Sequence, residues 1–410
     1  MAPTPAAPTK ESAAVAGPLA DFECSAVPAP PKMAQLNPPQ RLLCGPGPGN
    51  AHPRVHCAMA LPEIGHLDPA FIDMMEDVKE MLRYTWQTNN KFTIPVSGTG
   101  SAAMEAVVAN MVVAGDKILI GQNGYFGLRL ADMAQRYGGV VVSMKKPWGQ
   151  VFSYAEIKDA IHEHKPQLVA FIHAETSTGA AQPLEGVGEL CHDNNALLIA
   201  DCVTSISGVP CHLDKWGVDA AYAGTQKCLS CPPGVSPLTF SDRAMEKLMA
   251  RTDTVKNWYL DMKMVASYLV GGSGAPRSYH HTAPISMVYA IREALTIVCE
   301  EGLETRWARH REVAESFWAL LPTIGLEPYV AKEHRLPSLT TVKVPEGVDS
   351  KAVCTYLLKK YNIEIGNGLG ELQGKVWRIG LMGYNSRMDV VVTLIAVLKD
   401  ALAQQGYSKS

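Results

Sequence analysis

Residues 167–201 read QLVAFIHAETSTGAAQPLEGVGELCHDNNALLIAD. Apolar runs at 167–173 and 196–201 flank a stretch at 184–194 whose apolar residues recur at helical spacing. Two strands joined by a helix in this way form a parallel βαβ unit, because parallel strands need a long crossover between them. The stretch therefore predicts a parallel sheet covered by helices.

The same alternation continues on both sides of this unit. Further predicted strands are KILIG (117–121), GVVVSM (139–144) and VDAAYAG (218–224), and YAEIKDAIHEH (154–164) is a predicted helix. A helical zone from about 284 to 320 is followed by a shorter alternation of strands and helices.

Three regions follow from this pattern. We expect a large α/β domain at 41–300, with a mainly parallel sheet sandwiched by helices, and a smaller α+β domain at 301–410. Residues 1–40 are rich in Ala and Pro and lack sustained periodicity, so they are expected to form a flexible tail.

The composition excludes several classes of protein. Among 410 residues, 37 are basic and 40 acidic, and the formal charge of −3 gives no reason to expect nucleic acid or an anionic membrane as a partner. No apolar run approaches the roughly 18–20 residues that span a bilayer. The chain is therefore expected to be soluble and to act on small molecules.

The cysteines and the two ends of the chain bear on its compartment. The ten cysteines are scattered and are expected to be reduced thiols in an intracellular protein. Cys228 and Cys231 have the spacing of a metal-binding pair, but no second pair completes a zinc set, so no metal is expected. The compartment is undecided between the peroxisome and the mitochondrion. The first forty residues contain acids and no arginine, which is unusual for a mitochondrial targeting segment. The C-terminal Ser-Lys-Ser matches a peroxisomal signal only in its first two residues.

Chemically distinctive residues follow several predicted strands. Lys227 lies in DAAYAGTQKCLSCPPG (219–234), among small uncharged residues where a surface lysine is unusual, which indicates a chemical role. Asp201 ends an apolar strand, so its carboxylate is either a buried helix cap or the partner of a ligand's positive nitrogen.

Two further loops offer binding groups. Thr99, Gly100 and Ser101 begin a predicted helix, where they either hold a phosphate or form an ordinary cap. Phe126 lies in a glycine-flanked turn and either covers a planar cofactor or packs under the loop. A lysine, an aspartate upstream of it and a small-residue loop before a helix are together the groups that hold pyridoxal phosphate (PLP), through a Schiff base, the pyridinium nitrogen and the phosphate.

From LLCGPGPGN (42–50) to WRIGLMG (377–383), the chain resembles the alanine–glyoxylate (serine–pyruvate) aminotransferases, which are class V, fold-type I PLP enzymes. The motifs that carry the resemblance are GPGPGN, VSGTGSAAMEA, HAETSTGAAQPLEGVGELC, IADCVTSISGVP, AGTQKCLSCPPG, YHHTAP and RLPSLTTVKVP. Ser101 and Phe126 stand where the animal enzymes commonly have His and Trp.

The resemblance implies specific roles. Lys227 would form the internal aldimine, Asp201 would pair with the pyridinium nitrogen, and Arg378 would clamp the substrate carboxylate. Gly47 and Ser177 would lie on the substrate side. The residues implied to bind the cofactor, besides Asp201 and Lys227, are Thr99, Gly100, Ser101, Phe126, Ser177, Val203, Gln226, Tyr279 and Thr282. The last two of these match positions that reach the neighbouring subunit's phosphate in a homodimer with shared active sites.

The implied reaction is ping-pong transamination, in which alanine becomes pyruvate and glyoxylate becomes glycine. Serine or 3-hydroxykynurenine as the amino-group donor is an alternative within the same chemistry. A cysteine desulfurase would need a mobile nucleophilic cysteine. A PLP-binding sensor without turnover would more readily have lost Lys227 or Arg378, and both are present.

Overall fold

The computed structural model describes residues 29–270 and 278–407. Residues 29–39 are exposed and contain no helix or strand, and the described residues from Gln40 onward form one compact unit. Most of the expected flexible tail, residues 1–28, and the C-terminal Ser-Lys-Ser lie outside the described residues. Every helix in the described ranges is too short or too polar to span a membrane.

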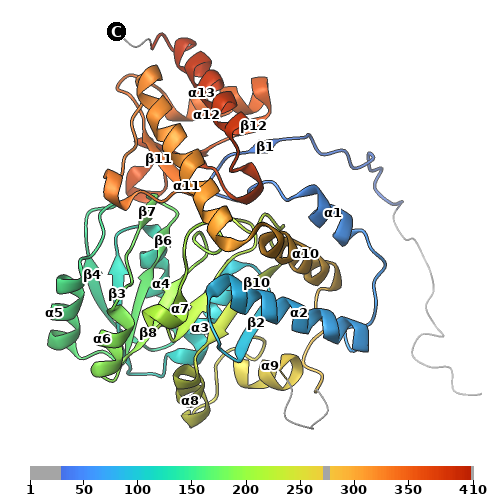
Figure 1. The fold of residues 1–410 in the computed structure, drawn as a ribbon, viewed down its shortest axis with the longest axis vertical. Coiled ribbons are helices and arrows are strands. Elements are labelled where there is room, and N and C mark those ends of the chain that lie inside the picture. The colour runs from blue at the N-terminus through green and yellow to red at the C-terminus, as the bar shows by residue number, and fades with distance from the viewer. Residues whose placement is uncertain (1–28, 271–277, 408–410) are drawn as a thin grey trace, which may run out of the picture. The chain divides into compact units, whose positions relative to one another are not determined.

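A seven-stranded sheet forms the centre of the compact unit, in the order β2-β10-β9-β8-β5-β3-β4 (Figure 1). Its strands are β2 (Phe92–Ser97), β3 (Lys117–Gln122), β4 (Val140–Lys145), β5 (Leu168–Ile172), β8 (Leu197–Asp201), β9 (Ala220–Tyr222) and β10 (Val235–Phe240). Only β10 runs opposite to the others, being antiparallel to both β2 and β9. The predicted mainly parallel sheet is confirmed.

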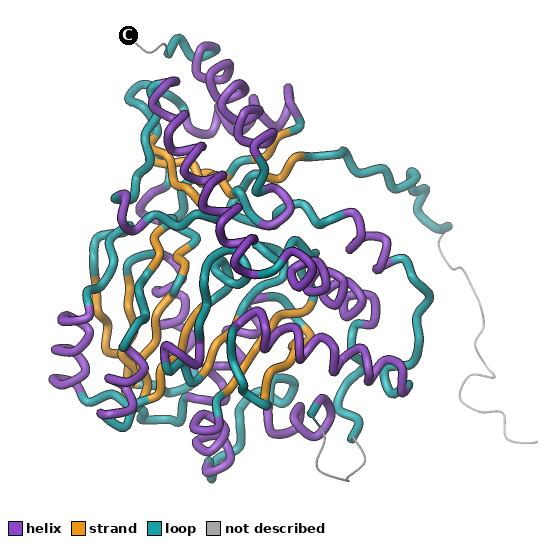
Figure 2. Tube along the Cα trace, viewed as in Figure 1, coloured by secondary structure: helices purple, strands orange, loops and turns teal. Residues whose placement is uncertain are grey.

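Helices enclose this sheet, as the tube in Figure 2 shows. They are α1 (Pro53–Met59), α2 (Pro69–Trp86), α3 (Gly100–Met111), α4 (Tyr125–Arg136), α5 (Tyr154–His164), α6 (Val187–Asp193), α7 (Leu213–Trp216), α8 (Asp242–Ala250), α9 (Met262–Leu269) and α10 (Ile285–Glu301). The predicted helix at 154–164 is α5, which begins at a capping box between Ser153 and Glu156.

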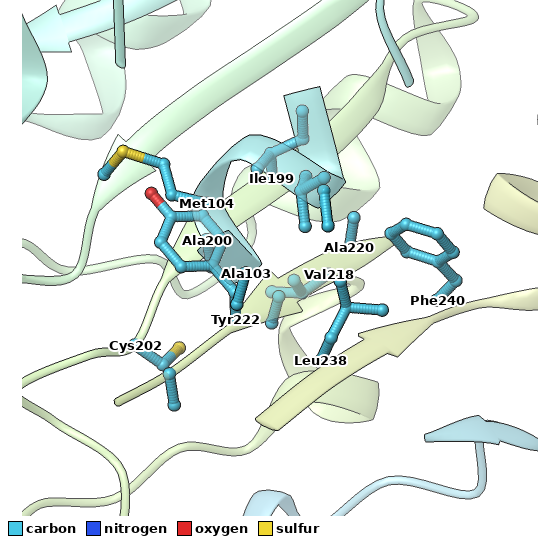
Figure 3. Packing of buried hydrophobic residues seen from close by; sticks show 14 of the residues in the cluster. Ala103, Met104, Ile199, Ala200, Cys202, Val218, Ala220, Tyr222, Leu238 and Phe240 are labelled. Carbon is cyan, nitrogen blue, oxygen red and sulfur yellow. The ribbon is translucent and has the colours of Figure 1, made fainter. Parts of the chain in front are cut away.

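Helix α3 packs onto β9 and β10 of the sheet. Ala103 and Met104 of α3 lie near Tyr222 of β9 in Figure 3, and all three side chains are buried. This packing fixes the start of α3 beside the ends of β8 and β9.

The C-terminal part contains a second, smaller sheet in the order β11-β14-β13. Its elements are α11 (Leu303–Leu320), β11 (Leu339–Lys343), α12 (Ser350–Tyr361), β12 (Ile363–Glu364), β13 (Gly366–Asn367), β14 (Val376–Gly380) and α13 (Met388–Ala403). The buried apolar side chains form two main clusters, one within residues 55–303 and one made of Cys44 and residues 313–402. On this basis the division into two domains near residue 300 is kept as a proposal.

The N-terminal β1 (Leu42–Leu43) pairs in parallel with β12. Cys44, the next residue, belongs to the C-terminal apolar cluster. The proposed small domain would therefore include residues 42–44 as well as the C-terminal part.

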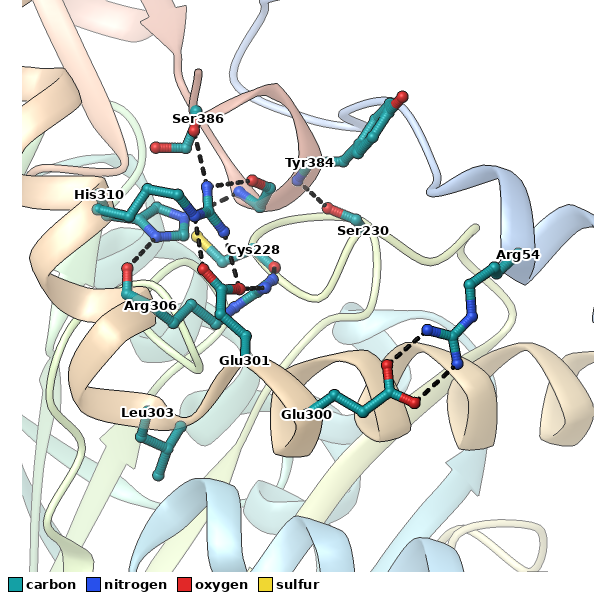
Figure 4. A network of polar contacts seen from close by, with 12 residues as sticks. Arg54, Cys228, Ser230, Glu300, Glu301, Leu303, Arg306, His310, Tyr384 and Ser386 are labelled. Atoms are coloured by element: carbon teal, nitrogen blue, oxygen red, sulfur yellow. Dashed lines mark hydrogen bonds and ion pairs between the residues drawn. The ribbon is translucent and has the colours of Figure 1, made fainter. Parts of the chain in front are cut away.

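A buried polar network joins α10 and α11 to the loop that carries Lys227 (Figure 4). Glu301 accepts hydrogen bonds from Arg306 and Arg309, each at 2.6 Å. Arg306 also donates to the carbonyl oxygen of Cys228 at 2.6 Å. Charge-assisted bonds between buried groups hold their partners firmly, so this network fixes the backbone immediately after Lys227.

Candidate active site

A cavity of about 180 Å³ lies at the carboxyl ends of the central strands. In parallel sheets ligands bind at this edge, because the loops that follow the strands converge there. The lining residues are Gly100, Ser101, Met104, Phe126, Arg129, Ile172, Ala174, Thr176, Asp201, Val203, Gln226 and Lys227. Most of the predicted cofactor-binding residues are among them.

Lys227 is buried on the loop between β9 and β10, with 8% of its surface exposed. Its Nζ donates a hydrogen bond to the carbonyl oxygen of Pro46. A Cβ at Gly47 would lie 2.5 Å from that Nζ and the φ of Gly47 is 114°, so any other residue would displace the lysine side chain and strain the backbone. Burial, and secondarily the charge of Arg378, lowers the pKa of Lys227 to about 8. About a tenth of the amine is therefore uncharged at pH 7, against less than a thousandth for a lysine with the ordinary pKa of 10.5.

Asp201 is the last residue of β8 and is 2% exposed. Its Oδ1 accepts a hydrogen bond from the backbone N–H of Val203 at 2.9 Å. The next α-helix, α7, is capped at His212, so Asp201 is not the cap of an α-helix. Burial raises the pKa of Asp201 to about 7. A carboxyl group in this state needs a nearby cation to stay charged at neutral pH.

The start of α3 faces the same cavity. Thr99 is the N-cap residue, but its side chain makes no capping hydrogen bond. A Cβ at Gly100 would lie 3.6 Å from both the Cα of Gly224 and the Cγ2 of Val203, so the loop and the helix start approach closely. Gln226 places Oε1 in a buried position without a hydrogen-bond partner among the described residues.

Ser177 lies outside the cavity lining, within a set of hydrogen bonds centred on Glu175. The Ser177 hydroxyl donates to Glu175 Oε1 at 2.6 Å and accepts from the N–H of Tyr125 at 2.9 Å. Glu175 also accepts from the N–H of Phe126 at 3.2 Å. Burial raises the pKa of Glu175. These bonds fix the turn that carries Phe126.

Arg378 extends from the middle of β14 toward the same region without lining the cavity. Its Nε donates to the carbonyl oxygen of Asn367 at 2.8 Å, which orients the guanidinium. Burial lowers the pKa of Arg378, and the charge of Glu175 opposes this effect. The two basic groups are close enough for Arg378 to lower the pKa of Lys227.

Tyr279 and Thr282 do not reach the cavity. Both are exposed, Tyr279 with 63% of its surface, and the ring of Tyr279 lies 5.5 Å from that of His66. The described part of the chain therefore leaves these two residues on the surface. The predicted residues that it brings to the cavity are Gly100, Ser101, Phe126, Asp201, Val203, Gln226 and Lys227.

A family model described as Aminotransferase class-V matches residues 55–392. The chain belongs to the class V aminotransferases. An alanine–glyoxylate aminotransferase of Callithrix jacchus is 42% identical over 377 residues, covering 91% of each chain. A solved alanine–glyoxylate aminotransferase from Nostoc sp. is 56% identical with a TM-score of 0.88, covering 90% of this chain and 97% of that one. A solved ureidoglycine–glyoxylate aminotransferase from Bacillus subtilis is 38% identical with a TM-score of 0.89, covering 92% and 96%.

This class V aminotransferase is a PLP-dependent enzyme of the α/β, fold-type I class. The residues in the cavity fit that cofactor. A buried lysine with a lowered pKa is suited to forming a bond with the aldehyde of PLP. The buried Asp201 carboxyl group, whose pKa is raised, would be stabilised in its charged form by the cationic ring nitrogen. The unpaired Gln226 amide can turn to present its NH₂ group to a phosphate beside Gly100.

Two residues of the site were missed by sequence reasoning. Arg129 lines the cavity, with its guanidinium carbon 4.8 Å from the Phe126 ring centre and its Nη1 3.2 Å from Ser101 Oγ. Arg129 follows Phe126 by one helical turn, and this spacing could have indicated that both side chains face the same site. Glu175 lies in HAETSTG, and no local pattern distinguishes this carboxylate from one on the surface.

The lowered pKa of Lys227 gives a pH-dependent prediction. Only the uncharged amine attacks an aldehyde, so the rate at which PLP rebinds to the cofactor-free protein should rise with pH and level off above about 8. With an unshifted pKa of 10.5 the rate would still rise about tenfold per pH unit at pH 9. Stopped-flow absorbance of the cofactor across pH measures the rate, and a tenfold rise from about pH 9 to about 10 would contradict the prediction.

Proposed function

We propose that this aminotransferase transfers the amino group of alanine to glyoxylate, giving pyruvate and glycine. The observation that carries the proposal is the placing of the Arg378 guanidinium near Lys227, beside a cavity of only about 180 Å³. Pockets for drug-sized ligands are typically about 300–1,000 Å³. A cavity that must hold the cofactor as well therefore favours a very small substrate that carries a carboxylate.

The comparisons support the acceptor more strongly than the donor. Glyoxylate appears in the names of the relatives from Callithrix jacchus, Nostoc sp. and Bacillus subtilis, whereas the named donor is alanine in the first two and ureidoglycine in the third. Glyoxylate is an aldehyde joined to a carboxylate, so its recognition depends almost wholly on the group that binds the carboxylate. Arg378 has the planar, two-pronged geometry that this task needs.

The protein side of the proposed mechanism follows from the burial and charge of the lining residues. When bound, PLP supplies an electron sink for the electron pair left at the substrate Cα. The Asp201 carboxylate would hold the ring nitrogen in its cationic form, and the start of α3 with Gln226 would hold the phosphate. Lys227 Nζ would accept the proton that leaves the substrate Cα and would deliver it to the C4′ carbon of the cofactor within the same half-reaction.

Replacement of Arg378 by lysine is expected to weaken the use of both alanine and glyoxylate. Lysine keeps the charge but loses the bidentate geometry, at a cost of about 1.5–3 kcal/mol, or about 10–150-fold in kcat/KM. The cofactor spectrum should stay nearly unchanged. Steady-state kinetics for both substrates measure the effect.

Arg335→Lys is a matched control, because Arg335 is also partly buried and donates its Nε to a backbone carbonyl, that of Val330, away from the cavity. It should keep wild-type kcat/KM. If Arg378→Lys also keeps the wild-type kcat/KM for glyoxylate, the carboxylate clamp lies elsewhere and the substrate proposal loses its main support.

The identity of the donor is tested by a panel of single half-reactions. Alanine, serine, 3-hydroxykynurenine and (S)-ureidoglycine are each mixed with the holoenzyme, and the rate of change of cofactor absorbance is measured. For each donor, the rate constant of the half-reaction is divided by the apparent dissociation constant of the donor. The proposal predicts that this ratio is highest for alanine. Ureidoglycine in first place would make the enzyme a functional counterpart of the Bacillus subtilis relative. A desulfurase is disfavoured, since none of the described residues that line the cavity is a cysteine.

We also infer that the enzyme acts as a homodimer. Tyr279 and Thr282 are exposed and outside the cavity of their own chain, which leaves them available to a neighbouring subunit. The holoenzyme should sediment at about twice the chain mass of 44.3 kDa. A mass of a single chain at micromolar concentration would contradict this inference.

A further inference from the structure

Three buried side chains with sulfur or imidazole ligand atoms lie close together next to the ends of β5 and β8. They are His173, Cys202 and Cys211, whose ligand atoms all lie within 4.8 Å of one another. Cys211 Sγ is 3.8 Å from His173 Nδ1. Both cysteines are fully buried and His173 is 7% exposed.

The sheet itself brings two of these residues together. Ile172 of β5 and Asp201 of β8 are partners in the parallel register, so the residues that follow them, His173 and Cys202, leave the sheet side by side. The N–H of His173 donates to the carbonyl oxygen of Asp201 at 3.0 Å, and the N–H of Cys202 donates to that of Tyr222 at 2.8 Å. Figure 3 shows Cys202 beside the Tyr222 strand. The backbone positions of these two ligands are therefore fixed before any ion binds.

The spacing is close to that of a tetrahedral metal site. Zinc binds sulfur at about 2.3 Å and nitrogen at about 2.0–2.1 Å, which places neighbouring ligand atoms about 3.5–3.8 Å apart. The Cys211–His173 separation of 3.8 Å already has this value, and the widest separation in the cluster is 4.8 Å at most. Closing that gap needs a movement of about 1 Å.

A fourth group faces the cluster. Ser205 is fully buried, and its hydroxyl lies within hydrogen-bonding reach of the thiols of both Cys202 and Cys211. Thiols are weak hydrogen-bonding partners, so a bound cation would give this hydroxyl oxygen a stronger contact.

We propose that His173, Cys202 and Cys211 bind one soft divalent cation, with Zn²⁺ as the expected ion and Ser205, which lies beside both thiols, as a candidate fourth ligand. Thiolate and imidazole ligands select zinc over Mg²⁺ or Ca²⁺. On binding, each thiol loses its proton to solvent, so two thiolates and one dication give a site without net charge. Such neutrality makes the deep burial of the ion tolerable.

The ion would hold the carboxyl end of β8 in place relative to that of β5. Cys202 follows Asp201 directly, and His173 is bonded to the Asp201 backbone, so a shared ion would tie these strand ends together. Metal binding at these residues is independent of which substrates the enzyme uses.

The test measures metal bound to the purified holoenzyme. After growth with zinc and dialysis, elemental analysis should give one zinc per chain. Prolonged incubation of zinc-depleted holoenzyme with Co²⁺ should give the intense visible bands of a tetrahedral thiolate site, and Zn²⁺ should abolish them. A wild-type holoenzyme that holds no zinc and develops no cobalt bands would overturn the proposal.

Variants assign the ligands. Cys202→Ala and Cys211→Ala should each lose the stoichiometric zinc and the cobalt bands, whereas Cys191→Ala should keep both, because Cys191 is equally buried on α6 but outside the cluster. Retention of full zinc by the Cys202 and Cys211 variants would refute the assignment. If a variant fails to fold, the zinc content and the cobalt spectrum of the wild-type protein still decide whether the site binds metal. If the only response of the wild-type protein is a Cys202–Cys211 disulfide, seen as a mass loss of two hydrogens, the pair is a redox couple and the metal proposal is wrong.

Discussion

Lys227→Ala is expected to lower transamination by about 10⁴-fold or more while leaving the fold intact. The side chain supplies the only amine among the residues that line the described cavity, and its pKa of about 8 makes it both a nucleophile and a base near neutral pH. The methyl group of alanine can do neither. Steady-state turnover of alanine with glyoxylate, together with circular dichroism and thermal unfolding, measures the two parts of this prediction.

Lys343→Ala is a suitable control, since Lys343 forms an exposed ion pair with Glu327 far from the chemistry. Exposed pairs contribute about 0–1 kcal/mol to stability, so this variant should keep wild-type turnover. Turnover of Lys227→Ala near that of the control would show that another group carries the proton, and the assignment of Lys227 would be lost.

Asp201→Asn is expected to slow removal of the Cα proton by about 10²–10³-fold. The amide has the shape of the carboxyl group but cannot carry the negative charge that holds a cationic ring nitrogen. Single-turnover mixing with alanine measures the step directly. A larger isotope effect with α-deuterated alanine in the variant than in the wild type would show that proton removal is the step that slowed.

Asp219→Asn separates this electrostatic role from a purely structural one. Asp219 is also a buried carboxylate next to the sheet, where it accepts hydrogen bonds from the Leu198 N–H and the Ser241 hydroxyl, both at 2.9 Å. Its replacement should lower stability with little change in the proton-removal rate. A single-turnover rate in Asp201→Asn equal to that of Asp219→Asn would contradict the role given to Asp201.

The sequence predicted much of the central sheet because buried parallel strands are continuous apolar runs. The runs at 117–121, 139–144, 167–173 and 196–201 correspond to β3, β4, β5 and β8 within one or two residues at each end. The long helical zone at 284–320 is two helices, α10 and α11, separated at Gly302, whose φ of 78° interrupts the helical backbone.

Other features depend on contacts that no local pattern encodes. β10 was not predicted, because Pro237 makes VSPLTF an unusual strand, yet it pairs with β2 and β9 on its two sides. The pairing of Leu42–Leu43 with Ile363–Glu364 joins two-residue strands from opposite ends of the chain. Periodicity cannot reveal so short and so distant a pair.

For the site, the strand-end residues Asp201 and Lys227 were found from their unusual settings, and the sheet brings them to one cavity as expected of parallel strands. The role of Arg378 was predicted only through the family resemblance. Arg378 lies on β14 of the smaller sheet, so its position near Lys227 depends on contacts between the two sheets rather than on a local pattern. Glu175 and Arg129 were missed because their roles arise from hydrogen bonds and ring contacts across separate loops.

The most direct test of the proposed function is a single half-reaction. Purified holoenzyme is mixed with alanine in the absence of glyoxylate, and the pyruvate released per chain is measured alongside the cofactor absorbance. The account predicts one pyruvate per chain, a complete change of the absorbance, and recovery of the original spectrum with formation of glycine when glyoxylate is added. Absence of pyruvate with an unchanged spectrum would contradict it.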